Sequence, residues 1–315
     1  MLASAKKLVD SYRDRIVSAA TSPFSHADFA LQNTMRYPDD PGMFGPDSVT
    51  WRVVGDAAAF VGGIRALLVQ AAHPEVVAGV SEHSSYREDP LGRLSRTSQY
   101  VTATSYGAMP EVEWSVAIVR RAHERVSGTS HRGIRYSAGK PDHAAWVHNA
   151  LTDSFLAAYR TYGRGPLTDD QADRYVAEQT KVGAMLDASP LPDTAAGLAS
   201  WVTDHPDLGW SPGMEETVSF LKNPPLSPAV RAGYWGLFEA AVATLPPSLS
   251  DLLGVTSLPG AEVRGRQLVR FLRWALGSSP SWNLALHRVG APIPPGLFRQ
   301  RLPNEVLHPE PAESP

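Results

Sequence analysis

Apolar residues recur at intervals of three and four along most of this chain, which is the spacing of the buried face of an α-helix. In the segment Pro110 to Ser127 this stripe is formed by Val116, Val119, His123 and Val126. The pattern predicts a helix there whose inner face carries one imidazole. A histidine in such a position needs a partner inside the protein, because burial of an unpaired polar group is costly.

Helix start and stop signals delimit further segments of this kind. Prolines stand in the first turns, glycines follow the last turns, and Thr168 with Gln171 forms a capping box. Alternating β-branched and polar residues form only short runs, and the sequence has no Asn-Gly or Asp-Gly hairpin turn. The predicted fold class is therefore all-α, with helices over residues 90–106, 141–162, 168–182, 227–242 and 260–276.

One domain accounts best for the length of the chain. The proline-bearing stretch Ala188 to Pro192 is the strongest internal break, but no long flexible or charged linker follows it. We expect a single helical domain over residues 1–300 and a proline-rich C-terminal tail over residues 301–315.

Composition removes several classes of site and partner. The chain has 315 residues, 43% of them hydrophobic, a formal net charge of -3 and no cysteine. The lack of cysteine excludes disulfides, thiolate nucleophiles, iron-sulfur clusters, Cys-ligated zinc and covalent c-type haem. A redox centre would have to be held by histidine, carboxylate or tyrosine. The scattered arginines and the small net charge disfavour nucleic-acid binding.

The N-terminal residues lack the continuous apolar segment of a secretory signal. The most apolar stretch, Ala57 to Ala72, is interrupted by Gly62, Gly63 and Arg65, so it is too short and too polar to cross a bilayer. We expect a cytoplasmic protein without a membrane span.

His123 is the first candidate for chemistry. Arg120, Arg121 and Arg125 lie within one helical turn of it, so positive charges stand beside a nitrogen ligand. Porphyrin iron needs an axial ligand, and its propionates need cationic partners, which this arrangement could supply. The alternative is a hydrogen-bonded core histidine next to a solvated arginine face.

A second group lies on the predicted helix over residues 90–106. Arg93 and Thr97 are four residues apart and share a face, with Arg96 and Tyr100 close to it. An arginine and a hydroxyl could position a propionate or steady a metal-bound oxygen species. The alternative is an exposed arginine and a threonine bonded to its own helix.

His148 is the third candidate, because its neighbours one turn away are Ala144, Ala145, Leu151 and Thr152. It faces inward and could act as an axial ligand or as an acid and base in a pocket, or it could be a hydrogen-bonded core residue. The His-Glu-x-x-His, P-loop and dinucleotide-binding patterns are absent from the sequence, which favours a bound prosthetic group over those classes.

Several segments together resemble one known family, the rubber-oxygenase and MpaB-type catalytic domain, which includes the bacterial latex-clearing proteins. The resemblance is strong over Trp51 to Asp187. It is carried by Gln70-Ala-Ala-His73-Pro74, Glu82-His83-Ser84, Asp89-Pro-Leu-Gly-Arg93-Leu-Ser-Arg96-Thr97, Arg120-Arg-Ala-His123, Tyr136-Ser-Ala and Trp146-Val-His148.

The resemblance implies an all-helical fold with a globin-like core around haem b, and oxidative cleavage of a carbon-carbon double bond in isoprenoid-like substrates. The proximal iron ligand of the latex-clearing members falls on His123, in the Arg-x-x-His motif that begins at Arg120. Arg93 and Thr97 match residues important for their haem site. Arg96 takes the place of their distal lysine, and a guanidinium is a poor iron ligand because it stays protonated.

From these observations we predict a haem b-dependent oxygenase that takes dioxygen and a small hydrophobic or isoprenoid-like substrate. His123 is the predicted metal ligand, Arg93, Arg96 and Arg120 are predicted to bind the cofactor, and the predicted catalytic residues are Arg93, Thr97 and His148. Two alternatives remain at this point: a haem or hydrophobic-ligand carrier on the same fold, and a helical scaffold without a cofactor.

Overall fold

The computed structural model describes residues 33–84, 90–302 and 304–307, together with residues 11, 13, 16, 17 and 31; for residues 90–94 and 229 it describes the backbone only. The fold is all-α, as predicted. Its helices are α2 (Val49–Val54), α3 (Ala59–Ala71), α4 (Pro74–His83), α5 (Pro90–Tyr106), α6 (Met109–His123), α7 (Pro141–Tyr162), α8 (Asp169–Ala184), α9 (Ala195–Thr203), α10 (Pro212–Lys222), α11 (Pro228–Val242), α12 (Pro247–Leu253), α13 (Ala261–Leu276), α14 (Pro280–Arg288) and α15 (Asn304–Leu307), and a 3-10 helix, η2, covers Thr34–Arg36.

The helix boundaries follow the start and stop signals closely. α5, α7, α11 and α13 lie where the sequence predicts them, and α8 begins with the predicted capping box. The main-chain N–H of Gln171 donates to the Thr168 hydroxyl at 3.2 Å, and that of Thr168 donates to the Gln171 side chain at 3.1 Å. The backbone bonds at this helix start are thereby satisfied.

The helix predicted over residues 110–127 is shorter than expected. α6 ends at His123, and the chain turns back so that the N–H of Val126 bonds to the His123 carbonyl at 3.0 Å. The following residues form a small antiparallel hairpin of β1 (Ser127–Thr129) and β2 (Arg135–Ser137). The prediction was wrong for Val126, because a helical spacing of apolar residues does not show where the helix stops.

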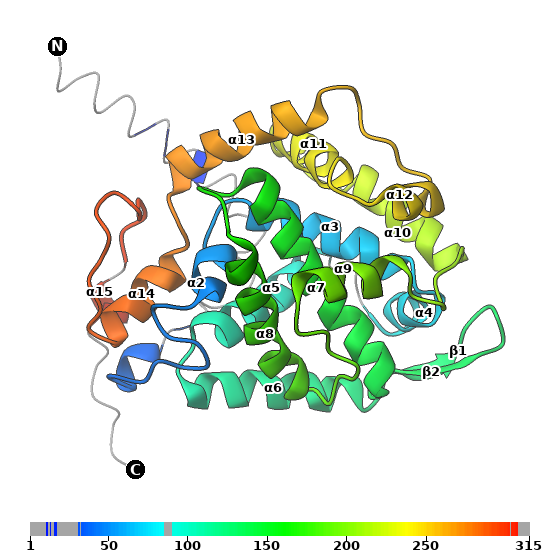
Figure 1. The fold of residues 1–315 in the computed structure, drawn as a ribbon, viewed down its shortest axis with the longest axis horizontal. Helices are drawn as coiled ribbons and strands as arrows, with labels where there is room; N and C mark the ends of the chain where they lie inside the picture. Colours follow the sequence, from blue (N-terminus) through cyan, green and yellow to red (C-terminus); the bar gives the residue numbers. More distant parts are fainter. Residues whose placement is uncertain are drawn as a thin grey trace.

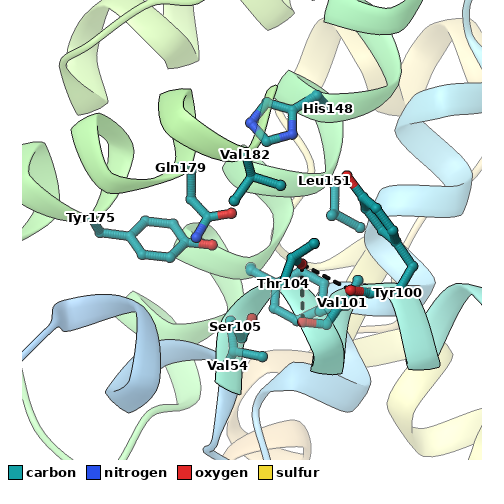
Figure 2. A pocket seen from close by; sticks show the side chains of 11 residues that line it. Val54, Tyr100, Val101, Thr104, Ser105, His148, Leu151, Tyr175, Gln179 and Val182 are labelled. Carbon is teal, nitrogen blue, oxygen red and sulfur yellow. Dashed lines mark hydrogen bonds between the residues drawn. The ribbon is translucent and has the colours of Figure 1, made fainter. Parts of the chain in front are cut away.

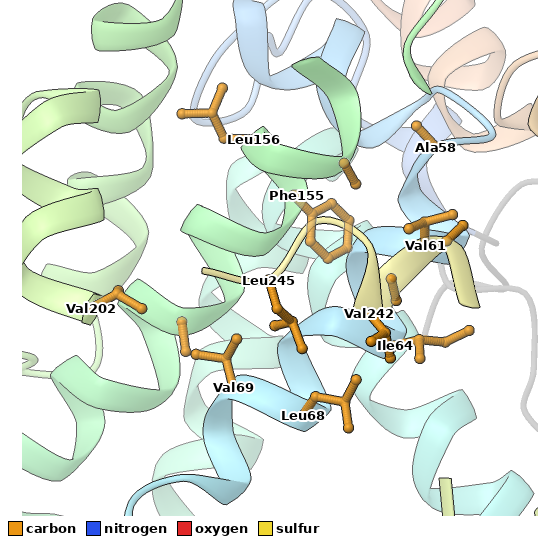
Figure 3. Close-up of a cluster of buried hydrophobic side chains, with 14 of the residues drawn as sticks. Ala58, Val61, Ile64, Leu68, Val69, Phe155, Leu156, Val202, Val242 and Leu245 are labelled. Atoms are coloured by element: carbon orange, nitrogen blue, oxygen red, sulfur yellow. The ribbon is translucent and has the colours of Figure 1, made fainter. Parts of the chain in front are cut away.

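The main core surrounds α3, which lies near the middle of the molecule with α7 along one side and α10, α11 and α13 nearby (Figure 1). Branched side chains of α3 meet aromatic and aliphatic side chains of α7 and the end of α11 (Figure 3). Gly62 of α3 permits this approach, because a Cβ at that position would stand 3.1 Å from the Cα of Phe155. The labelled members in Figure 3 include Val61, Ile64, Leu68, Val69, Phe155, Leu156, Val242 and Leu245.

A second apolar cluster joins α2, the end of α5, α14 and α15. Its centre is Trp51, whose indole N–H donates to the Ser105 carbonyl at 2.7 Å. The Tyr106 hydroxyl donates to the Trp51 carbonyl at 3.0 Å. These bonds satisfy polar atoms within the cluster and fix the end of α5 against α2.

A buried ion pair lies within the main core. Arg65 of α3 is 2% exposed and donates to Asp153 at 2.7 Å and to the hydroxyl of Ser154 at 2.8 Å, both on α7. Its Nε donates to the Thr244 carbonyl at 3.3 Å. The guanidinium therefore joins three segments of the chain.

Among the helices that the structure describes, none is long and apolar enough to span a bilayer.

The neighbouring glycines of α3 provide a matched pair of tests. Gly62→Ala should lower the free energy of unfolding by about 1–2 kcal/mol, because the added methyl group meets the backbone of α7. Gly63→Ala should raise it by about 0.5–1 kcal/mol, because nothing lies within 4 Å of the new Cβ and alanine favours the helix. Urea denaturation measures both values, and equal effects of the two substitutions would contradict the close approach of α3 and α7.

Removal of the Asp153 carboxylate should be far more costly. Asp153→Ala leaves the Arg65 guanidinium buried without its counter-charge, and we expect a loss of about 3–5 kcal/mol in the free energy of unfolding. Arg160→Ala is the control, since its ion pair with Asp169 is exposed, and this change should cost at most about 0.5 kcal/mol. Denaturant titration of the variants measures the difference.

Candidate functional site

A small pocket lies between α5, α7 and α8, with one side chain from α2 at its edge (Figure 2). The cavity is about 20 Å³, which is room for about one water molecule. The pocket as it stands has no room for a porphyrin. Its lining residues are Val54, Tyr100, Val101, Thr104, Ser105, His148, Leu151, Phe155, Tyr175, Gln179 and Val182.

Tyr100 supplies the unpaired polar group of this pocket. Its hydroxyl is buried and has no hydrogen-bond partner among the residues that the structure describes. Burial raises the pKa of Tyr100, so the hydroxyl keeps its proton. Thr104, one turn further along α5, is occupied instead, because its hydroxyl donates to the Tyr100 carbonyl at 2.8 Å (Figure 2). The Tyr100 O–H is therefore available to a water or to a polar atom of a ligand.

His148 of α7 lies on the opposite wall and is 7% exposed. Desolvation lowers its pKa to about 4, partly opposed by a hydrogen bond to the main chain of Gln179, so the imidazole is neutral near pH 7. α8 passes close to this ring at Gly183, where a Cβ would lie 2.8 Å from the His148 Cδ2 atom. A larger residue there would push the imidazole out of place.

His123 stands elsewhere, on the last turn of α6, which packs against α5. It is half-buried, and desolvation lowers its pKa below the ordinary value. Within the part of the chain that the structure describes, its ring makes no hydrogen bond, unlike an ordinary buried histidine. A neutral imidazole without a protein partner has a nitrogen lone pair free for a metal.

The arginines predicted to bind a cofactor lie apart from the pocket. Arg120 is half-exposed; its Nε donates to the Met185 carbonyl at 2.8 Å, and it pairs with Asp187 at 2.8 Å. Arg96 and Thr97 are exposed on α5, about two turns before the Thr104 position. The side chain of Arg93 lies outside the described residues.

The structure thus joins only part of the predicted set. His148 and the face of α5 that begins at Tyr100 line one pocket, whereas His123, Arg120, Arg96 and Thr97 do not line it. The contributions of Tyr175 and Gln179 were missed from the sequence. Both lie on the buried face of α8. Their spacing along the helix predicts burial, but it does not show which neighbouring helix they contact.

A comparison with protein families agrees with this architecture. The catalytic domain described as "ER-bound oxygenase mpaB/B'/Rubber oxygenase" matches residues 51–274, which extend from within α2 to near the end of α13. No curated protein and no solved structure is similar enough to this chain to count as a match. The chain therefore belongs to the mpaB and rubber-oxygenase catalytic-domain family, and it is an oxidoreductase of the oxygenase class.

Proposed function

We propose that this chain is a haem b-dependent oxygenase that acts on a small hydrophobic or isoprenoid-like substrate, with His123 as the proximal iron ligand. The observation that carries this proposal is the state of the His123 ring: half-buried, neutral and without a hydrogen bond among the described residues. Membership of an oxygenase family supports the reaction class. Bound haem would supply an iron centre that binds and activates dioxygen.

The residues around His123 fit a porphyrin on chemical grounds. α5 packs against α6 and carries Arg93, Arg96 and Thr97 in its first half, so cationic and hydroxyl donors stand on the neighbouring helix. Guanidinium groups bind carboxylates such as propionates through charge-assisted hydrogen bonds. Arg120 could join them at little cost, because its present ion pair with Asp187 is exposed and such pairs contribute about 0–1 kcal/mol.

The pocket of Tyr100 and His148 is too small for a whole isoprenoid, and its lining supports contact with one apolar end of such a substrate. Its walls are largely aliphatic and aromatic, and its three titratable side chains, Tyr100, His148 and Tyr175, are all neutral near pH 7. An apolar group therefore meets no unpaired charge there. In this proposal the Tyr100 hydroxyl holds a water or a polar end of the substrate, and neutral His148 accepts a proton when one is released nearby.

Loss of the proposed ligand is the first test. We expect the purified protein, free of any histidine tag, to bind haemin with a shifted Soret band, and His123→Ala to weaken this binding by at least about tenfold. His287→Ala removes an exposed histidine of α14 and should behave as the parent protein. The absorption spectra of haemin titrations measure the difference.

The same preparations separate an oxygenase from a carrier. Oxygen uptake in the presence of a terpenoid alkene, measured with an oxygen electrode, should require haem and be lost in His123→Ala. Haem binding without uptake would favour a carrier. A parent protein that leaves the haemin spectrum unchanged, or a His123→Ala variant that binds haemin equally well, would overturn the proposed ligand.

Two tyrosines of α5 test the pocket. Tyr100→Phe removes a buried hydroxyl that has no partner among the described residues, so the free energy of unfolding should rise by about 1–3 kcal/mol while oxygen uptake falls. Tyr106→Phe breaks the bond to the Trp51 carbonyl and should cost about 1 kcal/mol. Urea denaturation compares them, and equal destabilisation would show that the Tyr100 hydroxyl has a partner in solution.

A further inference from the structure

A cluster of imidazoles and a carboxylate lies away from the pocket, where the turn between α3 and α4 meets the segment after α9. His73, His205 and Asp207 each offer one ligand atom, and these atoms all lie within 4.8 Å of one another. The two segments are held together by a main-chain bond from Gly209 to the Ala72 carbonyl at 3.0 Å. None of these residues lines the pocket of Tyr100 and His148.

His73 is the buried member of the cluster and lacks the partner that a core histidine normally has. Its side chain is 3% exposed, and its Nδ1 atom makes no hydrogen bond within the described part of the chain. Desolvation and the neighbouring His143 and His205 lower the pKa of His73 to about 4, so the ring is neutral near pH 7. A buried, neutral and unpaired imidazole is a nitrogen donor ready for a metal.

A carboxylate is held beside this imidazole. Glu75 Oε2 lies 3.5 Å from the His73 Nδ1 atom. Glu75 is fixed by the hydroxyl of Ser130 at 2.7 Å and by Arg132, whose Nε donates at 3.1 Å. The Glu75 carboxylate therefore places a negative charge beside the unpaired His73 nitrogen, which favours a bound cation there.

His205 and Asp207 complete the donor set from the other segment. The His205 ring lies against Trp146 and Trp201, with ring centres 5.0 and 4.7 Å away, so its position is fixed by packing. The main-chain N–H of Asp207 donates to the His205 Nδ1 atom at 3.3 Å, and a metal bound through Nδ1 would replace this long hydrogen bond. The Asp207 carboxylate is exposed and can move toward the His205 ring.

A hydrolytic site is the other chemistry that histidine and aspartate could serve here. The nearby segment Gly209-Trp-Ser-Pro-Gly213 matches the Gly-x-Ser-x-Gly pattern of hydrolase nucleophiles. Ser211, however, is the N-cap of α10 and is 2% exposed, with its hydroxyl accepting from the Met214 N–H at 3.1 Å. The serine is a helix cap, and a metal remains the better use of the cluster.

We propose that His73, His205 and Asp207 bind a divalent transition metal ion of the zinc type. Two imidazoles and one carboxylate suit zinc, whereas calcium and magnesium prefer oxygen ligands alone. Ligand atoms around a tetrahedral zinc lie about 3.3 Å apart, so the cluster must contract by at most about 1.5 Å. The exposed carboxylate permits this movement, and its open side leaves a position for water.

Such an ion would join the start of α4 to the segment between α9 and α10. It would give the unpaired His73 nitrogen a partner. His143 packs against His73 with ring centres 5.5 Å apart, but it is outside the group of ligand atoms that lie within 4.8 Å of one another. The ion's main expected effect is to raise the stability of this junction.

The test uses the full-length protein without a histidine tag, first freed of metal by a chelator. Titration with Zn²⁺ in a calorimeter should show one site, and Co²⁺ should give the visible absorption bands of a nitrogen- and oxygen-bound ion. Asp207→Asn should weaken Zn²⁺ binding by at least about tenfold, and so should His205→Ala. His287→Ala is the matched control and should bind as the parent does.

The outcomes are distinguishable from those of the haem proposal. Zn²⁺ should raise the melting temperature of the parent protein and of His123→Ala alike, and that of Asp207→Asn much less. Asp207→Asn changes an exposed side chain, so it remains informative if His205→Ala fails to fold. Failure of the parent to bind Zn²⁺, or equal binding by parent and Asp207→Asn, would overturn the site.

Discussion

The contact between α3 and α7 is the constraint on which the rest of the structure depends. Gly62 lets the two helices approach closely, and the Arg65 guanidinium then pairs with Asp153 inside the contact. Burial of this charge is tolerable only because hydrogen bonds satisfy it from several sides. The α3 and α7 register is therefore fixed by polar bonds of defined direction as well as by apolar packing, which by itself has little directionality.

Both candidate sites follow from the register of α7. This helix carries His148 toward α5 and α8, where it lines the pocket, and its first turns bring His143 and Trp146 beside His73. Side chains on one helix keep fixed relative positions, so a shift of α7 along α3 would disturb both places together. A change in the core can therefore alter ligand binding without contact with any ligand.

The sequence predicted the elements well because helix formation is governed by nearby residues. Thr168, Gln171 and the glycine after α7 act over a few positions, and the structure confirms their effect. The inward position of His148 was also readable from its alanine and leucine neighbours one turn away. The end of α6 was not, because the turn after His123 is made by hairpin pairing with residues beyond Arg135, which no helical periodicity encodes.

The histidine cluster could not be predicted for a different reason. His73 is separated from His205 by most of the domain, and each residue alone has a sufficient local explanation, as a helix N-cap or as a stacking partner of Trp201. Only the folded path of α3, α7 and α9 brings them together. Distant donors carry no sequence spacing that a ligand motif could match, in contrast to the Arg120 and His123 pair, which lies on one helix.

Both places hold a buried polar atom without a hydrogen bond among the described residues, and such atoms also occur at Thr217, Trp282, Asn283 and Arg288. Each such atom costs about 1–3 kcal/mol, which is a large part of the stability of a domain. The cost of the unpaired Arg288 nitrogen is smaller, because the other nitrogens of that guanidinium donate to the Asp40 carbonyl, the Thr34 hydroxyl and the Tyr106 carbonyl. The Tyr100 side chain has a single hydroxyl and no other polar atom to share the cost. The His73 ring has one nitrogen without a hydrogen bond, and the possible metal ligands His205 and Asp207 lie close to it. In both cases a bound water, substrate or metal ion would recover that energy, so the cost paid in the unliganded fold becomes part of the affinity for the ligand.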